Sequence, residues 1–162
     1  MPRLPAPSID WYALTPILVL LGGALVLLVV GSLTSRWPKG LYALVAATTA
    51  GAAGTMAIFL WNDITAPPPD GGGARLMLSG AARVDLFAVW VTLAVCAAVL
   101  LTVLVTNDYL ERERMVASAP EIYSLYLMAA IGAIVMGAAN DLIVLFLGLE
   151  IMSIAMYVLA AS

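Results

Sequence analysis

One carboxylate stands alone inside a long apolar stretch near the end of the sequence. Glu150 is the ninth residue of the run Leu142–Ala161, so a helix of 1.5 Å rise would carry it roughly 13 Å into a membrane, near the midplane. Placing an ionised acid there costs about 3 kcal/mol, so we expect it to face a neighbouring helix or a hydrated cavity rather than lipid. Desolvation favours the neutral form of such an acid and a nearby cation favours the charged form. A carboxylate subject to both effects can change its charge when a partner moves, and a proton relay requires such a change.

Two further polar side chains share the predicted helix face of Glu150. Ser153 and Tyr157 follow it at i+3 and i+7, which predicts a single polar stripe on an otherwise apolar helix. A structural alternative is that Glu150 is a neutral, hydrogen-bonded acid that helps helices associate. No Lys or Arg lies inside any long apolar run, so a cationic partner for Glu150 must come from elsewhere.

The scarcity of His, Cys, Lys and Arg argues against metal, disulfide and nucleic-acid sites in this chain. The chain contains no His and only one Cys, Cys96, which lies inside an apolar run. A lone thiol without His forms neither an intrachain disulfide nor a zinc site, and we read Cys96 as a small apolar side chain in a helix. The few Lys and Arg residues are scattered between apolar runs and form no patch for nucleic acid. We therefore predict no metal, no bound cofactor and no nucleic-acid partner for this chain.

The composition indicates which elements must position Glu150. Of the 162 residues, 64% are hydrophobic and 10% are charged, whereas soluble domains carry roughly 25% charged residues. Runs of about 20 apolar residues are long enough to span a bilayer as helices. Such runs cover residues 13–33, 41–61, 86–106, 122–139 and 142–161, and Glu150 is the only charged residue inside them. The sequence predicts an all-α polytopic membrane protein with five transmembrane helices in a single membrane domain over residues 1–162, in contact with the lipid bilayer.

The basic residues between the spans predict the orientation. Cytoplasmic loops carry an excess of Lys and Arg. The first and third loops hold Arg36, Lys39, Arg112 and Arg114, whereas the second holds only Arg75 and Arg83 over a longer stretch and the fourth holds none. This distribution places the N-terminus outside the cell.

Local signals describe the connections and the packing faces. The second loop contains a Pro- and Gly-rich stretch, residues 67–73, which we expect to be irregular. Asp141 precedes the fifth span and is expected to cap that helix by accepting a bond from its free N–H groups. Small residues recur every fourth position in the second and fourth spans and predict close helix packing. They are Ala46, Ala50 and Gly54 in the second span and Ala129, Ala133 and Gly137 in the fourth.

The residues around Glu150 resemble a known family. The run from Asn140 to Ser153, NDLIVLFLGLEIMS, is similar to the fifth-helix motif of the antiporter-like subunits of respiratory complex I, the NADH-quinone oxidoreductase. The run RVDLFA, which begins at Arg83 and leads into the third span, favours subunit N over subunits L and M. The resemblance is firm from about Arg83 to Ala161.

This resemblance implies a fold, a role and partners. It implies a fold of about 14 helices, of which this chain would be an N-terminal piece. It also implies that Glu150 pairs with a lysine on a later helix and relays charge during proton translocation. NADH, FMN, iron–sulfur clusters and quinone would bind to other subunits of the complex. The complex would lie in the inner membrane of a bacterium. A Mrp-type cation/proton antiporter subunit and a five-span membrane scaffold without transport activity remain as alternatives.

Overall fold

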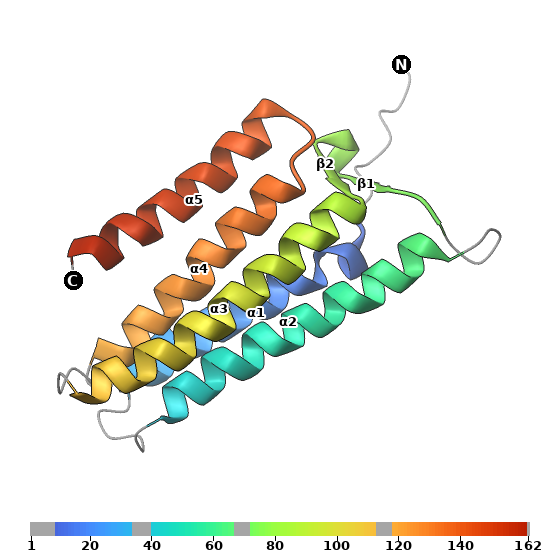
Figure 1. The fold of residues 1–162 in the computed structure, drawn as a ribbon. Helices are drawn as coiled ribbons and strands as arrows, with labels where there is room; N and C mark the ends of the chain where they lie inside the picture. Colours follow the sequence, from blue (N-terminus) through green and yellow to red (C-terminus); the bar gives the residue numbers. More distant parts are fainter. Residues whose placement is uncertain (1–8, 34–39, 67–71, 113–117, 162) are drawn as a thin grey trace.

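The computed structural model describes residues 9–33, 40–66, 72–112 and 118–161. Five long helices account for most of these residues (Figure 1). They are α1 (Trp11–Leu33), α2 (Leu41–Thr65), α3 (Leu86–Arg112), α4 (Ala119–Gly137) and α5 (Leu142–Ala161). All five are long and apolar enough to cross a membrane, which confirms the predicted all-α polytopic class. Three of them extend past the predicted spans at the ends where charged residues lie: Asp63 in α2, Asp108 in α3 and Glu121 in α4.

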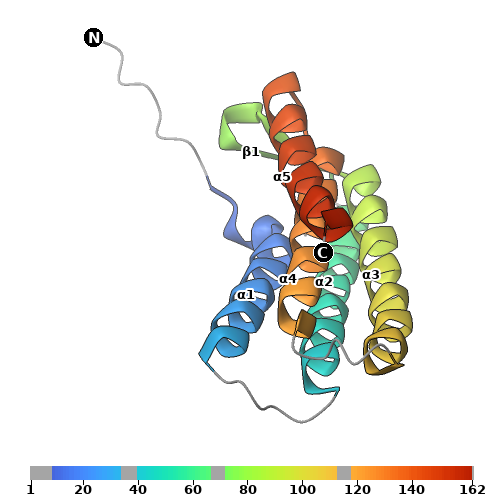
Figure 2. The same ribbon diagram turned by 90° about the vertical axis from the view of Figure 1, so that its left-hand side faces the viewer.

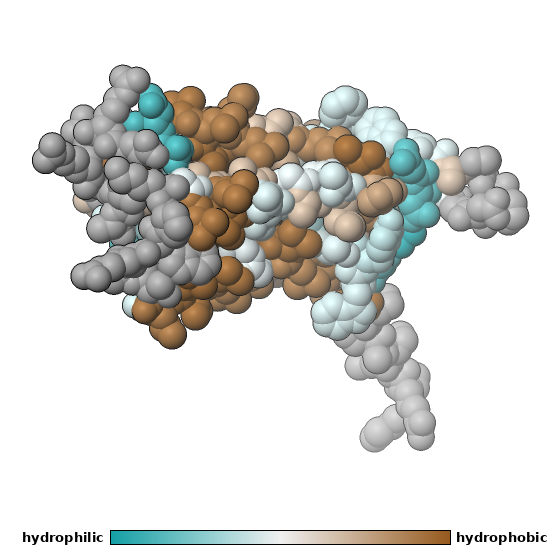
Figure 3. Space-filling model, turned by 90° about the horizontal axis from the view of Figure 1, so that it is seen from below, coloured by the Kyte–Doolittle hydropathy of each residue, from teal (hydrophilic) through white to brown (hydrophobic). Residues whose placement is uncertain are grey.

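The outer surface matches this class. In Figure 3 a broad band of hydrophobic residues covers the middle of the molecule and more hydrophilic residues lie toward its two ends. Within the helices, large apolar side chains such as Leu25, Phe59 and Leu104 are at least half exposed. A soluble protein rarely exposes so continuous an apolar surface, whereas a bilayer covers it.

Helices α1 to α4 form a bundle, and α5 lies outside it. Within the bundle α1 packs against α2 and α4, and α3 packs against α2 and α4, while α5 packs chiefly against α4. Figure 2 shows α5 in front of α4. The buried stripe of α2 is built of small residues at alternating spacings of three and four, and includes Ala46, Ala50, Ala53 and Ala57. This stripe continues through Ala53 instead of Gly54, because a straight helix drifts relative to a strict four-residue repeat.

A short β-hairpin closes one end of the bundle. Strands β1 (Arg75–Met77) and β2 (Ala82–Val84) pair antiparallel within the second loop. Their connection, the 3-10 turn η1 (Leu78–Gly80), places Leu78, Ser79 and Gly80 at positive φ. We call this end of the bundle the hairpin end. The sequence did not predict these strands.

The hairpin also determines where α4 ends. Ala82 bridges to Ala139, the Arg83 N–H donates to the Ala138 carbonyl at 2.8 Å, and the Asn140 N–H donates to the Ala81 carbonyl at 3.0 Å. The Ala138 N–H still donates to the Ile134 carbonyl of α4, but the Ala138 carbonyl and the Asn140 N–H bond to the hairpin instead of to α4. As a result α4 stops at Gly137, two residues before the predicted limit.

An arginine links three segments at the hairpin end. Arg75 donates to Asp10 at 2.8 Å and to Asp63, and its guanidinium lies 5.5 Å from the centre of the Tyr12 ring. These contacts join β1 to the start of α1 and the end of α2. The hydrogen bond to Asp10 raises the pKa of Arg75. Burial opposes ionisation of Asp10, but the bond and charge of Arg75 and the N–H groups of Ala13 and Tyr12 outweigh it and lower the pKa of Asp10.

Some sequence predictions fall on residues that the structure does not describe. Most of the Pro- and Gly-rich stretch, residues 67–71, lies outside the described ranges. The side chains behind the predicted orientation, those of Arg36, Lys39, Arg112 and Arg114, also lie outside them.

Candidate functional site

The candidate site begins with the start of α5. The Asp141 side chain accepts a hydrogen bond from the Val144 N–H at 2.8 Å, which confirms the predicted N-cap. The Asn140 side chain donates to the Gly80 carbonyl at 2.7 Å, so the residue before the cap is tied to the hairpin. From this fixed start α5 runs without interruption to Ala161 and carries Glu150 near its middle.

Glu150 points away from the rest of the chain. The buried residues of α5 are Gly148 and Ala155, which face α4. Two residues after Gly148, the helix has turned by about 200°, so Glu150 lies on nearly the opposite side. Its side chain is exposed in this chain. None of the described residues forms a hydrogen bond or ion pair with the Glu150 carboxylate.

The predicted polar stripe lies on this outward face. Tyr157 is 73% exposed and Ser153 is half-buried, both on the side of α5 that Glu150 occupies. The sequence predicts that the stripe faces a neighbouring helix or a hydrated cavity, and among the described residues no helix covers it. The roles predicted for Glu150, Ser153 and Tyr157 stay predictions.

Two glycines at the contact between α4 and α5, Gly132 and Gly148, are not among the small residues that the sequence pattern predicts to pack. A Cβ added to Gly132 would lie 2.5 Å from the Met152 nitrogen, and one added to Gly148 would lie 2.8 Å from the Met136 nitrogen. The backbones of α4 and α5 therefore touch at this crossing. The four-residue repeat through Ala129, Ala133 and Gly137 drew attention to a neighbouring face, and Gly137 packs against Val91 of α3. A glycine two residues before an intramembrane acid was the signal that could have found the crossing.

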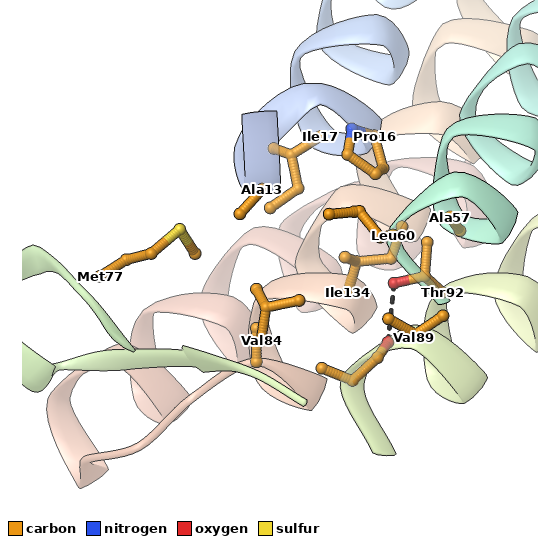
Figure 4. A pocket seen from close by; sticks show the side chains of 12 residues that line it. Ala13, Pro16, Ile17, Ala57, Leu60, Met77, Val84, Val89, Thr92 and Ile134 are labelled. Atoms are coloured by element: carbon orange, nitrogen blue, oxygen red, sulfur yellow. Dashed lines mark hydrogen bonds between the residues drawn. The ribbon is translucent and has the colours of Figure 1, made fainter. Parts of the chain in front are cut away.

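The cavity at the hairpin end offers little chemistry. A cavity of about 20 Å³ at the hairpin end is lined by apolar side chains from several elements, including Pro16, Leu60, Met77 and Val84 (Figure 4). Its one polar side chain, Thr92, already donates to the Ala88 carbonyl at 2.8 Å. No three His, Cys, Asp or Glu side chains gather into a possible metal site within the described ranges. Glu150, a charged residue near the middle of a membrane-spanning helix, is the residue on which we build the candidate functional site.

Comparison with known proteins connects this geometry to a family. No protein-family model matches the sequence. The chain is 32% identical over 98% of its length to NADH-quinone oxidoreductase subunit N 2 of Roseiflexus castenholzii. It is 33% identical over 98% of its length to NADH-quinone oxidoreductase subunit N of Deinococcus radiodurans. The chain belongs to the family of NADH-quinone oxidoreductase subunit N.

The matches to the Roseiflexus and Deinococcus proteins cover nearly all of this chain but less than a third of each relative. The chain spans 30% of the Roseiflexus protein and 31% of the Deinococcus protein. A shorter match, 41% identical over 47% of the chain, is found with subunit N of Trichlorobacter lovleyi. The similarity to the first two relatives covers all five helices, α5 with Glu150 included.

Proposed function

We propose that this chain forms part of a proton-translocating subunit N of a membrane-bound NADH-quinone oxidoreductase, with Glu150 as its charge-relay residue. The observation that carries the proposal is the position of Glu150, in the middle of a membrane-spanning helix and on the face turned away from the other helices of this chain. An acid in that position costs about 3 kcal/mol if it meets lipid while ionised. A helix with this residue on its outer face is therefore suited to a partner that supplies polar contact.

A cationic partner would complete the relay. The only Lys of the chain is Lys39, in the first loop, and no Arg lies near the middle of any of the five helices. The partner would be a lysine on a helix outside these 162 residues. When the cation approaches, it stabilises the carboxylate, and when it withdraws, desolvation favours uptake of a proton by Glu150. Alternation between these two states moves a proton with each movement of the cation, without redox chemistry in this chain.

The redox reaction belongs elsewhere in this proposal. NADH, FMN, iron–sulfur clusters and quinone would bind to other subunits, and this chain would contact other membrane subunits of the complex. The membrane would be the inner membrane of a bacterium. The hairpin end of the bundle would face the outside, because the helix ends that flank the basic first and third loops, Leu33 of α1 and Leu41 of α2 among them, lie at the opposite end of the bundle.

Substitution of the acid tests the relay. Glu150→Gln in the full-length subunit removes the charge and keeps the size, and it should abolish proton pumping per NADH oxidised in sealed membrane vesicles. Glu121→Gln is a matched control, because Glu121 is an exposed acid in the first turn of α4 and should be dispensable for pumping. Normal pumping by Glu150→Gln would refute the assignment. Weaker assembly with normal pumping per assembled complex would favour the five-span scaffold, and cation/proton exchange without NADH dependence would favour a Mrp-type antiporter.

A further inference from the structure

The closest approach between two helices near Glu150 is a contact of backbones. A Cβ on Gly132 would lie 2.7 Å from the Gly148 carbonyl oxygen, and a Cβ on Gly148 would lie 2.9 Å from the Gly132 carbonyl oxygen. The contact is thus reciprocal and involves atoms that cannot rotate away. An added methyl group on either residue would force α4 and α5 apart, since ordinary contacts begin at 3.4 Å.

This crossing and the hairpin together fix α5 at two points. At its start, Asn140 bonds to the hairpin through its N–H and its side chain. Six residues into the helix, Gly148 lies against Gly132. When a rigid helix is held at two points on one side, its rotation about its own axis and its depth in the membrane are both determined. The direction in which every other side chain of the helix points is then determined as well. For Glu150, that direction is away from α4.

We propose that Gly132 and Gly148 are positioning residues for Glu150. They set the depth and the angle at which α5 presents the carboxylate to whatever covers the outer face of this helix. The inference rests on the proposed function for its consequence in pumping, but the geometric statement stands separately. A displacement of roughly 1 Å at a reacting group can lower a rate by about 100-fold, so a contact that holds α5 to this tolerance matters for a relay.

The experiment uses the full-length subunit within its complex, in membrane vesicles. The variants are Gly148→Ala and Gly132→Ala, and the first readout is the rate at which an apolar carbodiimide labels Glu150, measured by mass spectrometry over a range of pH. Carbodiimides react with protonated carboxyl groups, so the rate reports the surroundings of Glu150 directly. The second readout is proton pumping per NADH oxidised, measured over the same pH range.

Two control variants carry the same Gly→Ala substitution at positions outside the contact between α4 and α5. Gly51→Ala adds a methyl group to α2 where the structure has open space. Gly137→Ala adds a methyl group that would lie 2.7 Å from Cγ1 of Val91, so it disturbs the contact of α4 with α3 instead of the contact with α5. Both should label Glu150 at the parental rate. The Gly148 and Gly132 variants should change the labelling rate by about tenfold and shift the pH profile of pumping, with normal assembly.

The outcomes separate this inference from the proposed function. Parental labelling in both the Gly148 and Gly132 variants would overturn the positioning role, even if Glu150→Gln abolishes pumping. Altered labelling in these variants together with normal pumping by Glu150→Gln would support the positioning role and refute the relay. Loss of assembly in both variants, with normal assembly of Gly51→Ala, would also overturn it, because the glycines would then serve folding rather than the placement of the acid.

Discussion

Replacement of Arg75 by Gln should loosen the hairpin end of the bundle by a calculable amount. Arg75 forms ion pairs with Asp10 and Asp63 and lies over the Tyr12 ring, and its side chain is 34% exposed. Exposed ion pairs contribute about 0.2–1 kcal/mol each, and a cation–π contact at such a site adds about 0.5–1 kcal/mol. The contacts share one guanidinium and are screened by water, so their loss should lower the free energy of unfolding by about 1–2 kcal/mol.

The assay is thermal unfolding in detergent, followed by tryptophan fluorescence, at low and high salt. The difference between Arg75→Gln and the parent should shrink at about 1 M salt, where the screening length falls to about 3 Å. Arg83→Gln is the matched control, because its ion pair with Asp85 is longer, at 3.4 Å, and its side chain is 50% exposed. An Arg75→Gln variant as stable as Arg83→Gln, or a difference that salt leaves unchanged, would refute the reasoning.

Two further predictions concern pH and core packing. The pKa of Asp10 is lower in the folded chain than its ordinary value of 3.8, so its stabilising effect is complete above that value and is lost as the pH falls through the folded pKa. The unfolding temperature should therefore drop as the pH falls below about 4 in the parent and drop less in Asp10→Asn, and an equal drop in both would contradict this. In the core, Leu127→Ala removes a fully buried side chain and should destabilise the protein by about 2–4 kcal/mol. Leu44→Ala, at a position that is 57% exposed, should cost far less in the same thermal assay, and similar costs would contradict the burial seen here.

Much of the local structure could be predicted because it depends on short-range patterns. The five apolar runs correspond to the five helices, since a membrane span requires about 20 apolar residues and forces their backbones into helices. Asp141 was predicted to cap α5 from its place before an apolar run, and the structure shows that bond. The small residues Ala46 and Ala50 were predicted to lie in a helix interface, and both are fully buried.

The hairpin could not be predicted because its support is distant in the sequence. Each strand has only three residues, too few for an alternating pattern to be recognised. Its edge is completed by residues 138–140, more than fifty positions further along the chain. The ion pairs of Arg75 with Asp10 and Asp63 likewise join residues that no local signal connects.

The sequence by itself determined that the chain crosses a membrane and that Glu150 lies near the middle of its last span. It did so because hydrophobicity and helical rise are properties of consecutive residues. Only the tertiary structure decided which way Glu150 points, since that depends on which side of α5 meets α4. The backbone contact between Gly132 and Gly148 makes that choice, because glycine alone lets two helices approach so closely. The carboxylate is thereby turned away from the other described helices of this chain.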